Sequence, residues 1–378
     1  MFSTSAGSNS AFKASTGYTR RLLTTAAAVI GLAPVAFELA IGAQAADPQT
    51  FFVLNNQNDP MFNQLLGINN GNVIVGYFGD GMEVANNGYV LVPANHYSVE
   101  NFTNVANCTA PPSMLFPPSP CPTQTQAIGI NEASGLAGAT PFADIVGFYT
   151  DIAGVTHGFL DSVGVQSTID DPNGVKGINT PVQNLLGINN ALRAAGFWTD
   201  NAGHEHGFVV NLIALPPPKE AFAELTPTKV SGDLGVNAVA TQTSDITNNN
   251  LVCGFWTDAN DINHGFTVPF NTKTNGFNAV APLTPKPPVV NVKSLSPFGC
   301  NDGGEVVGSF TANDGTVHGF VFDGNDWHNY DAAGSKQNAA FDVTGTTING
   351  INNAGTVVGF FADAMHNVNG FVDFAPVP

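Results

Sequence analysis

The sequence contains few charged residues, and few of these are basic. Only 11% of its 378 residues are charged, and 11 Lys and Arg oppose 29 Asp and Glu, which gives a net charge of −18. This shortage of charge excludes coiled coils and helical bundles, which are rich in Glu, Lys and Arg. The acidic excess argues against nucleic acid and anionic membranes as partners. A hydrophobic content of 43% is nevertheless enough to build cores.

The sequence also lacks the signatures of common catalytic and cofactor sites. It has no Gly-x-Ser-x-Gly, no P-loop and no His-Glu-x-x-His, and its four cysteines show no CxxC spacing. No helical periodicity is sustained after residue 46, so we expect no helix there. We therefore assign no catalytic residue and expect no bound cofactor.

Residues 1–45 have the layout of a secretory signal peptide. Three basic residues precede an apolar stretch over 22–41, and Ala43-Gln44-Ala45 supplies a small-x-small cleavage site. A transmembrane anchor is the alternative, but Pro34 and Glu38 interrupt the apolar stretch. No later stretch is long and apolar enough to cross a membrane. We predict cleavage near Ala45 and a secreted, extracellular or periplasmic protein.

One phrase recurs through the rest of the chain. It begins Gly67-Ile68-Asn69-Asn70, continues to Val75-Gly76-Tyr77, and in later copies ends on Thr-Asp and His-Gly-Phe. The copies start near residues 67, 129, 187, 245, 299 and 350. Short runs of Val, Ile, Phe, Tyr and Trp favour strands, and Asn-Asn-Gly between two runs favours a tight turn.

A repeat of about 55 residues with room for four strands is typical of a propeller blade. We therefore predict an all-β fold in which residues 46–378 form one six-bladed β-propeller. The last copy lacks its fourth strand, and residues 50–54 have the pattern of a strand without a repeat of its own. We expect this N-terminal strand to complete the last blade and close the ring. A linear stack of six units is the alternative.

The phrase resembles the HAF repeat, which defines a family of predicted extracellular repeat proteins. The resemblance covers about residues 67–372, with its Gly-Ile-Asn-Asn, Val-Val-Gly, Thr-Asp and His-Gly-Phe elements in order. It implies secretion and a β-propeller-like array. It implies no particular reaction.

Acidic and histidine side chains recur at fixed places in the phrase. An Asp ends the second strand and a His opens the third, so the two face each other across one hairpin. Because catalysis needs one site rather than several copies, we interpret them as a repeated structural hydrogen bond; an acid–base or metal site is the alternative. These residues are Asp80, Asp151, Asp200, Asp258 and Asp363, with His157, His206, His264 and His318.

Oxygen-rich turns make calcium the one cofactor that the sequence leaves open. The candidate ligands are Asp200, Asp258, Asp261 and Asp314. None of these turns has the spaced acidic pattern of an EF-hand loop, and Asp in turns usually binds the backbone.

A Pro- and Cys-rich insertion occupies residues 94–126 of the first repeat. Because Cys108 and Cys121 flank its proline cluster, we predict a disulfide between them in an exported protein. Cys253 and Cys300 lie in predicted strands of different repeats, where we interpret them as buried apolar residues.

The sequence favours a binding or scaffold module over an enzyme, with a protein or glycan at the cell exterior as its partner. The alternatives are a secreted carbohydrate-active hydrolase or lyase and a calcium-stabilised structural protein. An enzyme is expected to gather unrepeated acidic or His residues at one mouth of the channel. A binding module is expected to present apolar and aromatic loops there.

Overall fold

The computed structural model describes residues 51–92, 98–101, 122–132, 143–151, 153–162, 164–175, 182–332, 345–363 and 365–374. The predicted signal peptide, most of the insertion, and the predicted disulfide between Cys108 and Cys121 lie outside these residues. Within them, no helix is long and apolar enough to cross a membrane.

Each sequence repeat forms an antiparallel meander whose first strand ends at the Gly-Ile pair of the phrase, which is Asp245-Ile246 in the fourth repeat and Gly299-Cys300 in the fifth. The first two repeats comprise β2 (Asn63–Ile68), β3 (Ile74–Phe78), β4 (Asn87–Val92) and β5 (Ser98–Asn101), then β6 (Pro122–Ile130), β7 (Ile145–Asp151), β8 (Thr156–Ser162) and β9 (Val165–Ile169). The third and fourth comprise β10 (Gln183–Ile188), β11 (Arg193–Thr199), β12 (Glu205–Asn211) and β13 (Phe222–Leu225), then β14 (Ala238–Ile246), β15 (Leu251–Asp258), β16 (Asn263–Asn271), β17 (Gly276–Phe277) and β18 (Ala281–Pro282). The last two comprise β19 (Val292–Cys300), β20 (Val306–Ala312), β21 (Val317–Phe322) and β22 (Trp327–Tyr330), then β23 (Gly345–Ile351), β24 (Val357–Ala362) and β25 (Val368–Asp373).

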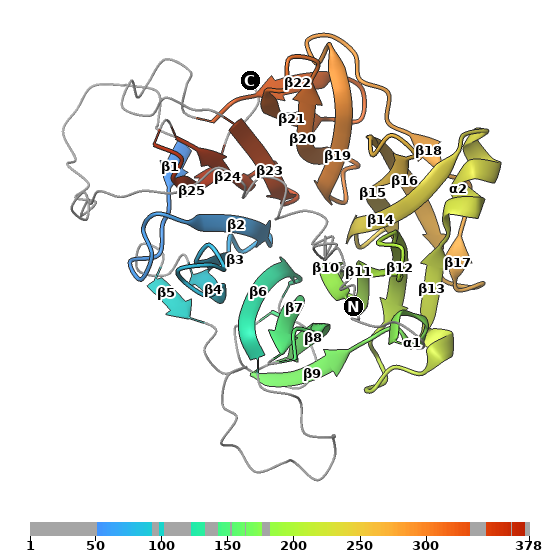
Figure 1. Ribbon diagram of the computed structural model, residues 1–378, viewed down its shortest axis with the longest axis horizontal. Helices are drawn as coiled ribbons and strands as arrows, with labels where there is room; N and C mark the ends of the chain where they lie inside the picture. Colours follow the sequence, from blue (N-terminus) through green and yellow to red (C-terminus); the bar gives the residue numbers. More distant parts are fainter. Residues whose placement is uncertain are drawn as a thin grey trace, which may run out of the picture.

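The sheets are arranged around a central axis like the blades of a propeller (Figure 1). Each of the first four repeats forms its own sheet, and the last two share an eight-stranded sheet. Within that sheet, a single parallel residue pair, Val317 with Gly345, joins the antiparallel strands of the fifth repeat to those of the sixth. The innermost strands β2, β6, β10, β14, β19 and β23 contact their neighbours in turn, and β23 contacts β2. The fold is therefore all-β and propeller-like.

The sheet of the last repeat is completed by the start of the chain. Strand β1 (Phe51–Val53) pairs antiparallel with β25, placing Phe51 opposite Asp373 and Val53 opposite Phe371. The ring of Phe51 also stacks on that of Phe371, with centroids 5.3 Å apart. The prediction that residues 50–54 supply the missing strand is confirmed.

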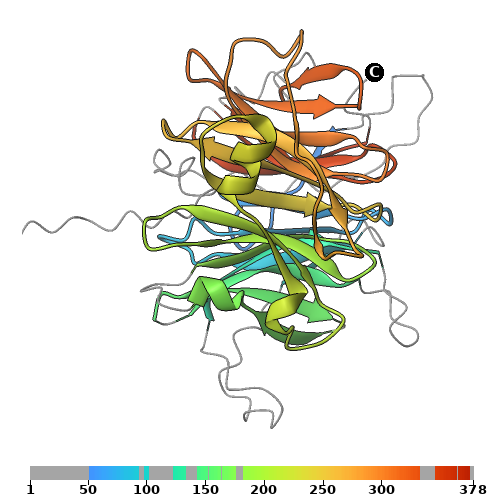
Figure 2. The same ribbon diagram turned by 90° about the vertical axis from the view of Figure 1, so that its right-hand side faces the viewer.

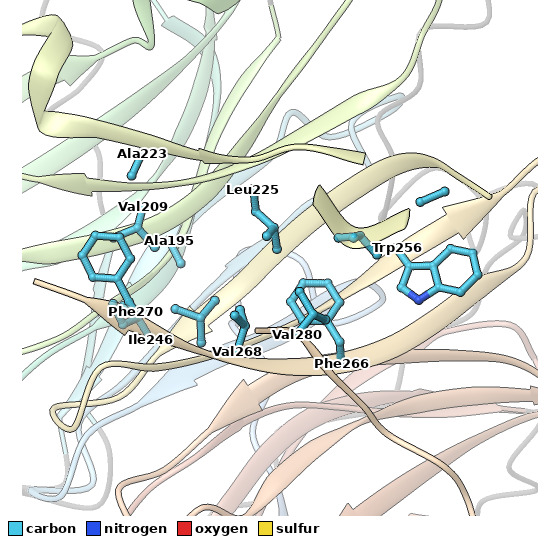
Figure 3. Close-up of a cluster of buried hydrophobic side chains, with 13 residues drawn as sticks. Ala195, Val209, Ala223, Leu225, Ile246, Trp256, Phe266, Val268, Phe270 and Val280 are labelled. Carbon is cyan, nitrogen blue, oxygen red and sulfur yellow. The ribbon is translucent and has the colours of Figure 1, made fainter. Parts of the chain in front are cut away.

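Neighbouring repeats are held together by hydrophobic clusters that lie between their sheets. Figure 3 shows the cluster between the third and fourth repeats, where Val209 and Leu225 meet Ile246 and Phe266. At every contact between repeats, the residue before the second-strand Gly lies in the same cluster as the residue that ends the next repeat's first strand. These pairs are Val75 with Ile130, Val146 with Ile188, Ala195 with Ile246, Cys253 with Cys300, Val307 with Ile351, and Val358 with Ile68.

Two helices occur where the sequence predicts none, so that prediction is wrong. They are α1 (Pro172–Val175) and α2 (Pro227–Leu234), with a 3-10 turn at Lys219–Ala221. Helix α2 lies at the outer side of the ring (Figures 1 and 2). Thr226 caps it by accepting a hydrogen bond from the Lys229 amide, and Gly235 ends it at φ 68°. An eight-residue helix is too short to produce a sustained period, but Thr-Pro at its start and Gly at its end are its local signals.

Candidate functional site

The turns between the first and second strands of the six repeats meet at one end of the axis. Each turn contributes two consecutive residues. The first are called here the turn residues: Asn69, Asn131, Asn189, Thr247, Asn301 and Asn352. The second are called the axial ring: Asn70, Glu132, Asn190, Asn248, Asp302 and Asn353. All of them line one hollow on the axis.

The turn residues fix their own turn, and the five asparagines among them also bind the next repeat. Asn69 Oδ1 accepts hydrogen bonds from the amides of Gly71 and Val73, both at 3.0 Å. Its Nδ2 donates to the carbonyl oxygen of Asn131 in the next repeat, also at 3.0 Å. Asn352, in the last repeat, donates in the same way to the carbonyl of Asn69 in the first, at 3.2 Å. One side chain thus supports both the hairpin and the contact between sheets.

The axial ring forms a closed cycle of hydrogen bonds. The backbone N–H of each member donates to the side-chain oxygen of the member in the next repeat. The bonds run from Asn70 to Glu132 (2.8 Å), Glu132 to Asn190 (2.9 Å), Asn190 to Asn248 (2.9 Å), Asn248 to Asp302 (2.7 Å), Asp302 to Asn353 (2.9 Å), and Asn353 back to Asn70 (2.8 Å). Each of these six backbone donors therefore has a partner across the boundary between two repeats.

Glycine precedes these turns because the innermost strands touch one another there. A Cβ atom on Gly67 would lie 2.4 Å from the carbonyl oxygen of Ile128 in the next repeat. The fourth repeat carries Asp245 at this position instead. Its carboxylate fits because the preceding repeat has Gly187, where a Cβ would lie 2.1 Å from Asp245 Oδ1. Asp245 is therefore the one member of the set that places a side chain at this close approach.

The hollow has a volume of about 70 Å³, and its lining contains carboxylates but neither Lys nor Arg among the described residues. Partial burial acts to raise the pKa of Asp302, but hydrogen bonds from Asn248 and Asn353 outweigh it, and the pKa lies below its usual value. Burial raises the pKa of Asp245 to about 6, although the amides of Cys300 and Ile246 donate to it. The hollow is consequently an acceptor-rich, negatively charged site at neutral pH.

The predicted Asp and His residues lie at the other end of the second strands. Asp200 Oδ1 accepts hydrogen bonds from the amides of Ala202 (2.8 Å) and His204 (2.9 Å), and its Oδ2 lies 3.2 Å from His206 Nε2. His206 stacks on Trp198 with ring centroids 4.1 Å apart. The fourth repeat repeats this arrangement, with Asp258, His264 and Trp256 in the corresponding places.

The other copies keep the turn but change the partner. His157 lies 2.7 Å from Asp170 and 3.6 Å from Asp151. His318 lies 2.8 Å from Asp331, and Ala312 occupies the usual Asp position in that repeat. Asp363 receives a hydrogen bond from Asn369 where other repeats have His. Asp80 accepts three backbone amides, those of Met82, Glu83 and Val84. Each predicted Asp and His residue thus forms its contacts within its own repeat, and the structure does not bring those of different repeats together.

The calcium candidates are also engaged in their own turns. Asp258 Oδ1 accepts the amides of Asn260 and Ile262, and Asp314 Oδ1 accepts the amide and hydroxyl of Thr316. Asp261 closes the turn that begins at Asp258, at φ 66°. Across the described residues, no three His, Cys, Asp or Glu side chains form a group that could hold a metal ion.

The mouth at the axial ring lacks the apolar and aromatic loops expected of a binding module and carries carboxamides in their place. It meets part of the pattern expected of an enzyme, because three unrepeated carboxylates, those of Glu132, Asp245 and Asp302, line the hollow, although no His does. The Trp198 and Trp256 rings are buried, at 8% and 7% exposure, beneath stacked histidines. Sequence reasoning missed the hollow because it treated the Asn pairs as turn formers alone; Glu132 and Asp302, where the phrase departs from Asn, were the available signal.

No protein-family profile and no curated protein sequence matches the chain. Among solved structures, SapL1 lectin in complex with alpha methyl fucoside is similar at 9% identity, covering 82% of this chain and 92% of its own, with a TM-score of 0.47. A mutant of Aleuria aurantia lectin in complex with Fucalpha1-6GlcNAc matches at 10% identity, 86% and 93% coverage, and a TM-score of 0.45. AofleA from Arthrobotrys oligospora matches at 8% identity, 85% and 86% coverage, and a TM-score of 0.42. Identities and scores this low carry no inference about what this chain binds.

Proposed function

We propose that this protein is a non-catalytic binding module that takes a neutral carbohydrate at the axial hollow. The observation that supports this is the axial ring, whose carboxylates and carboxamides face one polar hollow. Asn70 and Asn190 are exposed, and their side-chain Nδ2 groups have no hydrogen-bond partner among the described residues. Sugar hydroxyls both donate and accept, so they match a site that combines carboxylate acceptors with amide donors.

The charge of the hollow selects among carbohydrates. Glu132 and Asp302 occupy opposite positions of the axial ring, and no basic residue is among the described residues that line the hollow. An acidic sugar would meet uncompensated negative charge, so we expect neutral sugars to be preferred. A volume of about 70 Å³ accommodates about five water molecules. We expect the hydroxyl edge of a terminal sugar to displace this water while the rest of the glycan lies over the mouth.

Binding can be tested with an array of neutral and acidic glycans, followed by calorimetric titration of those that bind. We expect Asp302→Asn and Glu132→Gln to weaken binding of a neutral glycan at least about tenfold, the effect of losing one charge-assisted hydrogen bond. Asp326→Asn is the matched control, because Asp326 is exposed in the outer turn between β21 and β22. A glycan that binds all four proteins equally, or the absence of any binding glycan, would contradict the proposal. Turnover of a bound glycan would contradict its non-catalytic part.

We further propose that the six repeats form six blades, and that the chain is an exported member of the HAF-repeat family. The blade count is supported by six hydrophobic clusters between successive repeats and by a single residue pair joining the fifth to the sixth. Export is supported by the layout of residues 1–45. Amino-terminal sequencing of the exported protein tests it, with Ala46 expected as the first residue.

A further inference from the structure

Two buried cysteines lie side by side between the fourth and fifth repeats. Cys253 is on β15 and Cys300 ends β19, and their exposed fractions are 0% and 5%. Both belong to one hydrophobic cluster, both are free thiols, and their side chains interact with each other. Cys300 also lines the axial hollow.

These positions are equivalent to a pair that recurs at every contact between repeats. At the other five contacts, both positions carry aliphatic residues, such as Val75 with Ile130 and Val358 with Ile68. Only between the fourth and fifth repeats is either position a cysteine, and there both are. The described residues contain no other cysteine. If each cysteine merely replaced an aliphatic residue as a small apolar side chain, there would be no reason for both replacements to occur at the same contact. Their occurrence as a pair therefore indicates that the two cysteines act together.

We propose that Cys253 and Cys300 form a disulfide that joins the fourth and fifth repeats. A small-molecule disulfide such as oxidised glutathione is the oxidant. The thiolate of one cysteine attacks it, releasing one thiol and leaving a mixed disulfide. The second cysteine then attacks that mixed disulfide and releases the second thiol. Both protein thiols lose their protons, the protein gives up two electrons, and one oxidant molecule becomes two thiols.

Oxidation is expected during folding rather than after it. Burial raises the pKa of both thiols, so the folded protein presents little thiolate, and both side chains are buried against attack by an oxidant. The bond must therefore form while the two repeats are docking. Once formed, it is protected from reductant by the same burial.

The proposal is tested by refolding full-length protein carrying Cys108→Ser and Cys121→Ser, so that only this pair remains. After refolding with mixed reduced and oxidised glutathione, the protein is denatured in acid, alkylated and weighed. We expect a mass 2 Da below that of the dithiol form, no alkylation, and one proteolytic fragment that separates into two peptides on reduction. Its melting temperature is expected to exceed that of protein refolded with reductant by about 5 °C.

A matched control carries Cys253→Val and Cys300→Ile in the same background, the pair found between the sixth and first repeats. We expect it to fold and to melt at the same temperature with and without oxidant. Alkylation of both cysteines after oxidative refolding would overturn the proposal, as would a glutathione adduct on either one or a disulfide between two chains. These mass measurements decide the question even if the control variant does not fold.

Discussion

The two ends of the ring use the same kinds of side chain in opposite ways. At the axial end, Asn69 binds its own turn and the next repeat, and the axial ring closes a cycle through all six repeats. At the other end, Asp200 and His206 bind only within their own hairpin. Equal recurrence in the sequence therefore conceals two tasks. In these examples, the axial residues join neighbouring repeats, and Asp200 and His206 shape a single hairpin.

The two ends also respond differently when the phrase changes. In the sixth repeat, Asn369 occupies the position of the His and donates to Asp363, so this substitution is accommodated within the hairpin itself. A change at the axial end must be matched in a neighbouring repeat, since Asp245 fits only beside Gly187. We therefore expect substitutions at the axial end to cost more stability and to loosen contacts between repeats.

The largest effect is expected where innermost strands touch. In Gly67→Ala, the new Cβ would meet the backbone carbonyl of Ile128 at 2.4 Å, so the first two repeats must move apart. We expect a loss of about 3 kcal/mol in unfolding free energy, measured by denaturant titration. Gly232→Ala is the control, because nothing lies within 4 Å of a Cβ there. In helix α2 it should gain about 0.5–1 kcal/mol. Equal effects of the two substitutions would contradict the close approach.

The next test compares one polar side chain from each end. Asn352 is buried, accepts the amides of Ala354 and Thr356, and donates to Asn69 in the first repeat. We expect Asn352→Ala to cost about 2–3 kcal/mol, because it leaves buried groups without partners. Asp200→Ala removes a partly exposed cap and should cost about 1 kcal/mol. We expect Asn352→Ala to speed amide hydrogen exchange in the first repeat as well as in its own, and Asp200→Ala to speed it only in its own repeat. Spread of exchange in both variants, or in neither, would refute the contrast.

A smaller, pH-dependent effect is expected at Asp245. Its folded pKa of about 6 lies above the ordinary value of 3.8, so its contribution to stability is present below pH 3.8 and is lost as the pH rises through 6. Between pH 4 and pH 8, the unfolding free energy of the wild type should fall by about 1–2 kcal/mol relative to that of Asp245→Gly. This is less than the pKa shift alone would give, because the carboxyl faces the hollow and solvent screens its charge. Denaturant titrations at the two pH values measure this. If the unfolding free energies of the two proteins change with pH in parallel, the folded protein does not raise the pKa of Asp245 and the prediction is wrong.

The smallest effect is expected at the opposite end, at His157. Burial acts to lower its pKa, but the hydrogen bond and charge of Asp170, with the charge of Asp151, raise it above its ordinary value of 6.5. Its stabilising contribution is therefore present below pH 6.5 and is lost as the pH rises through the folded pKa. We expect the melting temperature to fall slightly as the pH rises above neutral. In His157→Gln and in Asp170→Asn, this dependence of the melting temperature on pH should be weaker. A slope that survives both substitutions must come from other groups.

The sequence predicted the parts of this fold that depend on periodicity. Six copies of the phrase and an unassigned strand at residues 50–54 were sufficient to predict an all-β ring completed by β1. The same pattern gave an incomplete prediction for residues that both form a turn and bind a neighbouring repeat. The Asn pairs were interpreted as turn formers, and nothing local to Asn70 reveals that its oxygen accepts from Asn353, 283 residues away.

Exceptions to the phrase were harder to interpret than the phrase itself. Asp245 was not singled out at the start of the fourth copy, although a carboxylate in place of glycine at the axis is half-buried and has a raised pKa. Cys253 and Cys300 were placed in the correct strands, but only packing shows that they face each other. Such pairings depend on the docking of sheets, which a single sequence does not specify.

The pairing of β1 with β25 has a consequence for how the chain is made. Asn55 bonds to Asn369, 314 residues further along, so the segment around β1 lacks its strand partner until β25 has been synthesised. Contacts this distant in the chain form slowly, and strand edges are exposed while they wait. The cell must therefore keep an incomplete ring from pairing with other chains until β25 has left the ribosome.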